Sequence, residues 1–132
     1  MAAWENEPNE INWEDPLTGY PCMLRRNDVG AWCGYVGLSK GHPWFGVGYS
    51  DIDPYPTVHG GVTFADYWST DDPRWWIGFD CCHYTDIAPA VCTFREGKVY
   101  RDMDYVTAET VNLAMQAKQV SVNALKSSVH GA

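Results

Sequence analysis

Two histidines with nearby aspartates are the residues whose types and spacing could carry chemistry. His59 precedes a Gly-Gly pair, and His83 lies in the segment 80–86, which reads Asp-Cys-Cys-His-Tyr-Thr-Asp. Two imidazoles close to carboxylates could bind a divalent metal, form a general acid/base pair or hydrogen-bond a polar ligand. A structural interpretation also fits, in which the histidines cap strand ends and the aspartates fix turns. The sequence keeps all of these alternatives open.

Two aspartates at the end of a preceding loop extend this candidate site. We expect a ligand-binding set made of Asp51, Asp53, His59, Asp80, His83 and Asp86. Neither an HxH nor an HExxH spacing occurs, so we predict no metal site and no cofactor, and we assign no catalytic residue. The 5 cysteines include no CxxC pair. Buried free thiols are therefore favoured over metal ligation.

Four aromatic residues lie in the irregular segment 39–58. The glycines and prolines of this segment predict a long loop, and loops of this length often carry function. Tryptophan and tyrosine are also enriched at binding hot spots. We therefore predict partner contacts by Trp44, Phe45, Tyr49 and Tyr55, against the alternative that these rings belong to the core. Exposed loop aromatics would also favour a homodimer.

Two hairpins are expected to position these groups. The first joins Tyr20–Arg26 to Ala31–Leu38 through an Asn-Asp-Val-Gly turn, whose residues tolerate positive φ. Strand alternation puts Trp32 on one face of this hairpin and Tyr35 on the other.

The second hairpin joins residues 60–68 to residues 74–83. If the last residue of its first strand pairs with the first residue of its second strand, antiparallel register places His59 opposite His83. Directly opposed Cβ atoms lie about 5 Å apart. This register predicts that the two imidazoles meet.

A long helix is predicted for about residues 107–125, after a short strand near Ala90–Arg95 and a turn at Glu96-Gly97. The apolar stripe of the helix comprises Leu113, Ala117, Val120 and Ala124. Strands first and one helix last indicate the α+β class. We expect an antiparallel sheet of four or five strands with the C-terminal helix packed on one face. The predicted organisation is an acidic arm (1–19), a single domain (20–126) and a flexible tail (127–132).

The chain is acidic, with a formal net charge of -8 over 132 residues. This charge argues against direct binding of nucleic acid. No apolar run approaches the roughly 20 residues that span a bilayer, and the N-terminal residues do not resemble a secretory signal. We therefore expect a cytoplasmic protein without membrane contact.

Several segments resemble a group of small proteins encoded by phages and prophages. The most specific are the HGG segment at 59–61 and the GFDxxH segment at 78–83, and the similarity covers roughly residues 20–120. The resemblance implies a setting, infection of a bacterial cell, and no mechanism. In that setting, small acidic proteins often bind a host factor or a host signalling molecule.

These observations favour a binding protein over an enzyme. We predict a small phage-type accessory protein that binds a host protein or a small polar ligand and so counters host defence. The alternative is a small metal-dependent or His/Asp hydrolase that uses His59, Asp80, His83 and Asp86.

Overall fold

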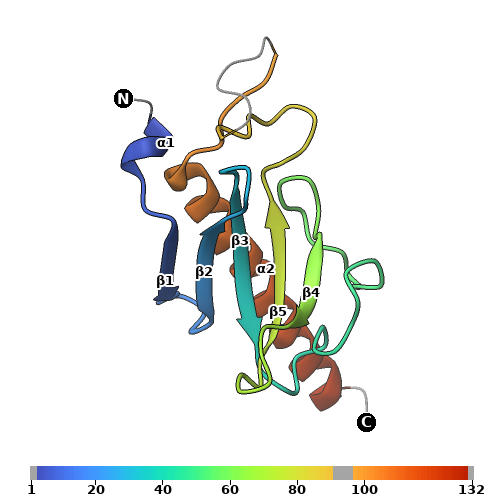
Figure 1. Cartoon of the computed structure of the whole chain (residues 1–132). Helices are drawn as coiled ribbons and strands as arrows, with labels where there is room; N and C mark the ends of the chain where they lie inside the picture. The colour runs from blue at the N-terminus through green and yellow to red at the C-terminus, as the bar shows by residue number, and fades with distance from the viewer. Residues whose placement is uncertain (1–2, 91–96, 131–132) are drawn as a thin grey trace.

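The computed structural model describes residues 3–90 and 97–130. Within them the chain forms two helices and five strands (Figure 1). Their bounds are α1 Ala3–Asn6, β1 Glu10–Glu14, β2 Pro21–Arg26, β3 Trp32–Leu38, β4 Phe64–Tyr67, β5 Trp75–Asp80 and α2 Met103–His130.

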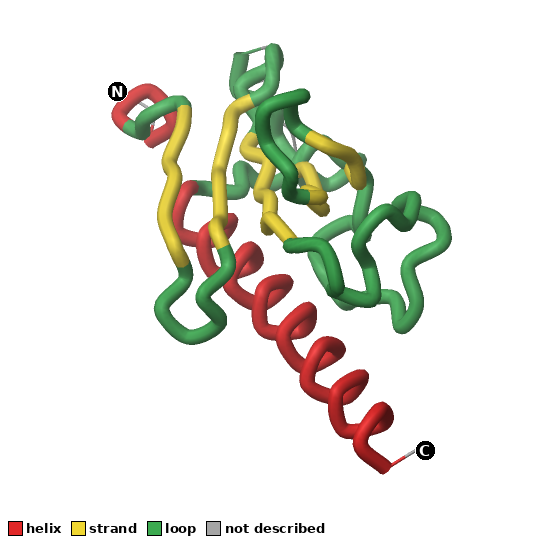
Figure 2. Tube along the Cα trace, turned by 90° about the horizontal axis from the view of Figure 1, so that it is seen from below, coloured by secondary structure: helices red, strands yellow, loops and turns green. Residues whose placement is uncertain are grey.

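The five strands form one antiparallel sheet in the order β1-β2-β3-β5-β4. Helix α2 crosses one face of this sheet, behind the strands in Figure 1 and alongside them in Figure 2. This arrangement confirms the predicted α+β class and the long C-terminal helix. No helix in the described part of the chain is long and apolar enough to cross a membrane.

Helix α2 is longer than its apolar stripe predicts. It runs from Met103 to His130, so residues 127–130 of the expected tail are helical. The predicted strand at Ala90–Arg95 lies outside the described residues, except for Ala90 itself, which belongs to a turn.

The expected N-terminal arm requires correction, because part of it is a strand of the sheet. Residues Glu10–Glu14 form β1 and pair with β2, with Trp13 opposite Cys22. The segment alternates polar and apolar residues, which matches the two-residue period of a strand. Its apolar residues pack against the core while its polar residues lie on the opposite face.

The first hairpin is confirmed in its turn and in its two faces. The Asn27 side chain accepts hydrogen bonds from the amides of Val29 and Ala31, at 3.1 and 3.0 Å. Gly30 adopts a φ of 80°, which a residue without Cβ reaches at no steric cost.

The second hairpin is confirmed in its register, although β4 is shorter than predicted. Phe64 pairs with Gly78, and Tyr67 pairs with Trp75. The register is not kept beyond the strand, because the amide of Thr63 donates to the carbonyl of Gly78 at 2.9 Å, the residue that Phe64 already opposes.

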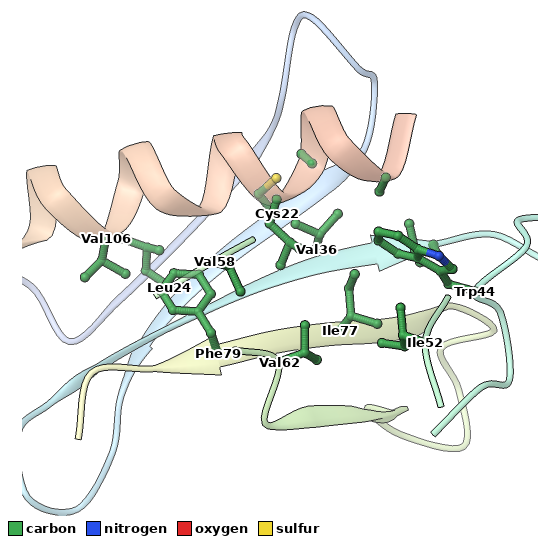
Figure 3. Packing of buried hydrophobic residues seen from close by; sticks show 14 of the residues in the cluster. Cys22, Leu24, Val36, Trp44, Ile52, Val58, Val62, Ile77, Phe79 and Val106 are labelled. Atoms are coloured by element: carbon green, nitrogen blue, oxygen red, sulfur yellow. The ribbon is translucent and has the colours of Figure 1, made fainter. Parts of the chain in front are cut away.

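The hydrophobic core lies between the sheet and α2 (Figure 3). The sheet contributes fully buried side chains such as Leu24, Val36 and Phe79, and α2 contributes Leu113 and Ala117. The loop 39–63 completes the core beside the helix. Its buried apolar residues are Trp44, Ile52, Val58 and Val62.

The N-terminal segment is tied to the start of α2 by Glu7. Its carboxylate accepts hydrogen bonds from the Met103 amide at 2.8 Å and from the Tyr100 hydroxyl at 2.5 Å. It also forms an ion pair with Arg26 at 3.2 Å, in which the arginine side chain is only 6% exposed. A negative charge at a helix N-terminus is stabilising, so Glu7 joins the N-terminal segment to the start of α2.

The opposite face of the sheet, toward the viewer in Figure 1, carries no helix in the described part of the chain. Aromatic rings cover it instead, and they lie over glycines. A Cβ at Gly78 would lie 2.4 Å from the Tyr35 ring, and a Cβ at Gly37 would lie 3.0 Å from the Trp76 ring. These glycines let large side chains lie flat on the sheet.

Candidate functional site

The structure brings His59 and Asp86 into direct contact. Nε2 of the imidazole lies 3.0 and 2.9 Å from the two carboxylate oxygens. The carboxylate side chain is fully buried and also accepts hydrogen bonds from Nε of Arg101 at 2.9 Å and from the His83 amide at 3.0 Å. Asp86 therefore joins three segments that are far apart in the sequence.

The environment of Asp86 keeps it ionised. Burial alone would raise its pKa, but the hydrogen bonds from His59, Arg101 and the His83 amide outweigh burial and hold the pKa below its ordinary value. A carboxylate with this many donors is a structural acceptor, because its lone pairs are already used inside the protein.

The second nitrogen of His59 is engaged as well. Nδ1 lies 2.8 Å from the hydroxyl of Tyr105, at the start of α2. Burial and the nearby charge of Glu109 raise the pKa of Tyr105, so this phenol stays protonated. Because both ring nitrogens have partners within the chain, His59 has no vacant nitrogen that could act as a general base on a substrate.

His83 lies beside His59, with ring centroids 5.8 Å apart, as the hairpin register predicts. Its Nε2 is 3.3 Å from a carboxylate oxygen of Asp80, but the contact lacks hydrogen-bond geometry. The same atom lies against Gly60, where a Cβ would be only 2.1 Å away. The glycine is thus needed for the two histidines to meet.

Asp80 is held by the hairpin. It accepts hydrogen bonds from the Thr63 hydroxyl at 2.8 Å and from the Cys82 amide at 3.0 Å. No group of three or more His, Cys, Asp or Glu side chains within residues 3–90 and 97–130 is arranged to hold a metal ion.

The structure does not bring Asp51 and Asp53 into this corner. Both are exposed, and neither side chain makes a hydrogen bond or ion pair with another described residue. The predicted ligand-binding set therefore separates into a connected group around Asp86 and two isolated loop carboxylates.

The predicted contact aromatics also separate. Trp44 is 1% exposed and packs in the core, so it cannot contact a partner in this structure, and the prediction requires correction. Phe45 is half-buried against Trp75. Tyr55 is exposed, but its hydroxyl is held by the backbone of Val62. Tyr49 is exposed, and its hydroxyl makes no hydrogen bond with another described residue, so this ring remains suited to partner contact.

A groove lies on the sheet face that α2 does not cover. Its volume is about 740 Å³, within the usual range for ligand sites. We call it the open-face groove, and its lining includes Glu10, Glu14, Met23, Trp68, Asp72 and Trp76.

Trp68 forms the aromatic wall of the open-face groove. It follows β4 and turns back over the sheet, where its ring contacts Tyr35, Phe64 and Trp76 with centroids 5.1, 5.7 and 6.5 Å apart. The ring remains 36% exposed. A rigid, partly exposed aromatic cluster of this kind is typical of binding surfaces.

The rim of the groove is acidic. Three carboxylates, from Glu10, Glu14 and Asp72, line it together with the single guanidinium of Arg74. Asp72 accepts a hydrogen bond from the Trp76 indole at 2.8 Å and lies 3.7 Å from Arg74. Glu14 makes no side-chain hydrogen bond or ion pair with any other described residue, so its charge is available to a ligand.

The sequence contained signals for this groove. The alternation of Glu10–Glu14 indicates a strand, and the tryptophans at 68 and 76 lie on the predicted second hairpin. The sequence did not predict that β1 pairs with β2. Composition does not show whether a segment lies next to the first hairpin in space.

Comparisons with protein-family models, with curated proteins and with solved structures find no match to this chain.

Proposed function

We propose that this chain is a non-enzymatic binding protein, a small phage-type accessory protein that binds a host protein or a small polar ligand in the cytoplasm of an infected cell. The observation that carries the proposal is the open-face groove, with its exposed Trp68 wall and its acidic rim. The sheet that holds the groove packs on α2 through its other face. Little conformational entropy is then lost when a partner binds.

The hydrogen bonds of the His59 corner support binding over hydrolysis. A His/Asp hydrolase needs an imidazole nitrogen or a carboxylate oxygen that faces the substrate. Both nitrogens of His59 and both oxygens of Asp86 already have partners within the chain. Nε2 of His83 makes no hydrogen bond with another described residue, but it is buried against Gly60 and does not face solvent. We assign this corner to holding the segments around α2 in place.

Capture from a bacterial lysate tests the proposal if matched variants are compared. The immobilised wild-type protein is compared with Glu14→Gln and Trp68→Ala in the groove and with His83→Ala in the histidine corner. Circular dichroism confirms that each variant is folded, and bound proteins and small molecules are both quantified by mass spectrometry.

The proposal predicts that the groove variants lose at least about fivefold of the captured partner, as expected for removal of a hot-spot side chain. His83→Ala should retain it. Equal capture by the wild type and the groove variants would contradict the proposal, and loss in His83→Ala alone would move the binding site to the histidine corner.

A further inference from the structure

The open-face groove combines an indole surface with a carboxylate that has no partner among the described residues. Trp68 presents a ring that is 36% exposed, the largely buried Trp76 ring lies beside it, and Glu14 lines the same groove. Aromatic rings attract cations through their quadrupole, and a carboxylate that pairs with the same cation adds a charge-assisted hydrogen bond. The whole chain carries a formal charge of -8, which draws cations toward the surface. The chemistry of the groove therefore suits a cationic group.

The chain itself shows how a guanidinium is held beside this groove. Arg25 places its guanidinium 5.2 Å from the centroid of the Trp68 ring. The same group forms an ion pair with Glu10 at 3.2 Å. The arrangement is a planar cation between an indole and a carboxylate from β1.

The neighbouring part of the groove also has an indole, from Trp76, and a carboxylate, from Glu14. Among the described residues, no arginine or lysine pairs with this carboxylate. Glu14 is on the same face of β1 as Glu10, four residues further along the strand. The Trp76 ring lies across Gly37, toward Pro21, the residue that pairs with Glu14. The side chain of Arg74 pairs with Asp72 instead. An exposed carboxylate and the largely buried Trp76 indole thus both line this part of the groove.

Resting on the proposed function, we propose that the open-face groove receives an arginine side chain from an exposed basic segment of a partner protein. The guanidinium lies against the exposed part of the Trp68 indole, next to the largely buried Trp76 ring, and pairs with Glu14. Arginine fits better than lysine, because its planar group stacks on an aromatic ring while its N–H groups donate to a carboxylate. The backbone of the partner segment then crosses the sheet over Met23.

Nuclear magnetic resonance with a defined probe tests this inference. The probe is a blocked five-residue peptide with arginine at its centre and alanine elsewhere, and its controls carry lysine or uncharged citrulline. The labelled wild-type protein, Glu14→Gln and Asp51→Asn are each titrated. Asp51→Asn removes the same charge from an exposed residue outside the groove.

We expect saturable shifts of the Trp68 and Trp76 indole N–H signals and of the Glu14 amide. The affinity for the arginine peptide should exceed that for the lysine peptide by about threefold or more, as the energy of a cation–π contact implies. Glu14→Gln should weaken binding by a similar factor, and Asp51→Asn should weaken it less.

The inference is overturned if these signals do not shift saturably, if citrulline or lysine binds as tightly as arginine, or if Asp51→Asn has the effect of Glu14→Gln. Groove shifts that depend on protein concentration without peptide would also overturn it, since a second copy would then fill the groove. If the peptide fails but lysate capture still requires Trp68 and Glu14, the arginine assignment fails alone. If capture is also independent of these residues, the proposed function fails with it.

Discussion

The carboxylate of Asp86 lies 2.9 Å from Nε2 of His59, although the two residues are 27 positions apart in the chain. The same carboxylate holds Arg101, which leads into α2. The contact thus connects the loop before β4, the segment after β5 and the helix. Its consequences are structural and can be measured as stability.

Replacement of Asp86 by Asn should lower the free energy of unfolding by about 2–3 kcal/mol. The side chain is fully buried, and its loss of charge leaves Arg101 and His59 without their acceptor. Urea unfolding monitored by tryptophan fluorescence measures the effect. Asp53→Asn, at an exposed loop position, serves as the control and should leave the midpoint unchanged. Equal midpoints for wild type and Asp86→Asn would contradict the assigned role.

The dependence of stability on pH should report the same carboxylate. The pKa of Asp86 is lowered in the folded chain, so the unfolded chain binds its proton at higher pH than the folded chain does. Its contribution is complete above the ordinary value of 3.8 and is lost as the pH falls through the lower folded pKa. We expect the unfolding free energy to fall more steeply below about pH 4 in the wild type than in Asp86→Asn. Parallel pH profiles would show that Asp86 is not responsible.

The glycines beneath the aromatic rings should be intolerant of a methyl group. A Cβ at Gly78 would lie 2.4 Å from the Tyr35 ring and 2.7 Å from the Gly34 carbonyl oxygen. Because backbone atoms cannot shift easily, Gly78→Ala should lower the free energy of unfolding by about 2 kcal/mol or more. Gly48→Ala is the matched control, because the nearest atom to its new Cβ is 3.9 Å away. Thermal unfolding distinguishes them, and a similar midpoint for both variants would argue against close ring packing.

The partly buried carboxylate of Glu7 should stabilise the whole fold through its contact with α2. Glu7→Gln removes the charge that pairs with Arg26 and that faces the Met103 amide. We expect a loss of about 2 kcal/mol, since a buried arginine is left without its counter-charge. The comparison is Glu5→Gln, at an exposed position of α1, which should leave the unfolding midpoint of the wild type unchanged. If both variants unfold alike, the N-terminal segment does not stabilise the sheet.

Thiol reactivity should single out Cys82. Burial raises the pKa of Cys22 to about 12 and of Cys33 to about 11, and it raises the pKa of Cys81 as well. Cys82 is exposed, and thiolate and access control alkylation. In a Cys92→Ser background, which removes the cysteine outside the described residues, one thiol per folded chain should react with iodoacetamide near pH 8. Rapid labelling of two or more would show that the core cysteines are accessible.

The sequence was sufficient to predict the hairpins, because local signals define them. The Asn27 turn and the pairing of β4 with β5 both follow from residues within one hairpin, and the two histidines lie near each other at its open end. The partners of these histidines could not be predicted in the same way. Tyr105 and Arg101 reach His59 and Asp86 from the start of α2, and such contacts depend on where the helix packs.

Burial of the loop aromatics was equally beyond local patterns. Trp44 is a residue type that is common at contact surfaces, but its side chain fills the core. Nearby, Nε2 of His42 lies 2.7 Å from the Ala117 carbonyl of α2, which holds this loop against the helix. The open-face groove forms because β1 pairs with β2. No local sequence pattern predicted that pairing, because a turn segment separates the two strands in the chain.

Chemical-shift mapping with the partner recovered from lysate tests the central claim most directly. Isotope-labelled protein is mixed with that partner, and backbone amide and indole signals are followed. The largest changes are expected at Glu14, Met23, Trp68 and Trp76 in the open-face groove. Changes concentrated at Asp51, Tyr49, His83 or Asp86, with the groove signals unmoved, would contradict it.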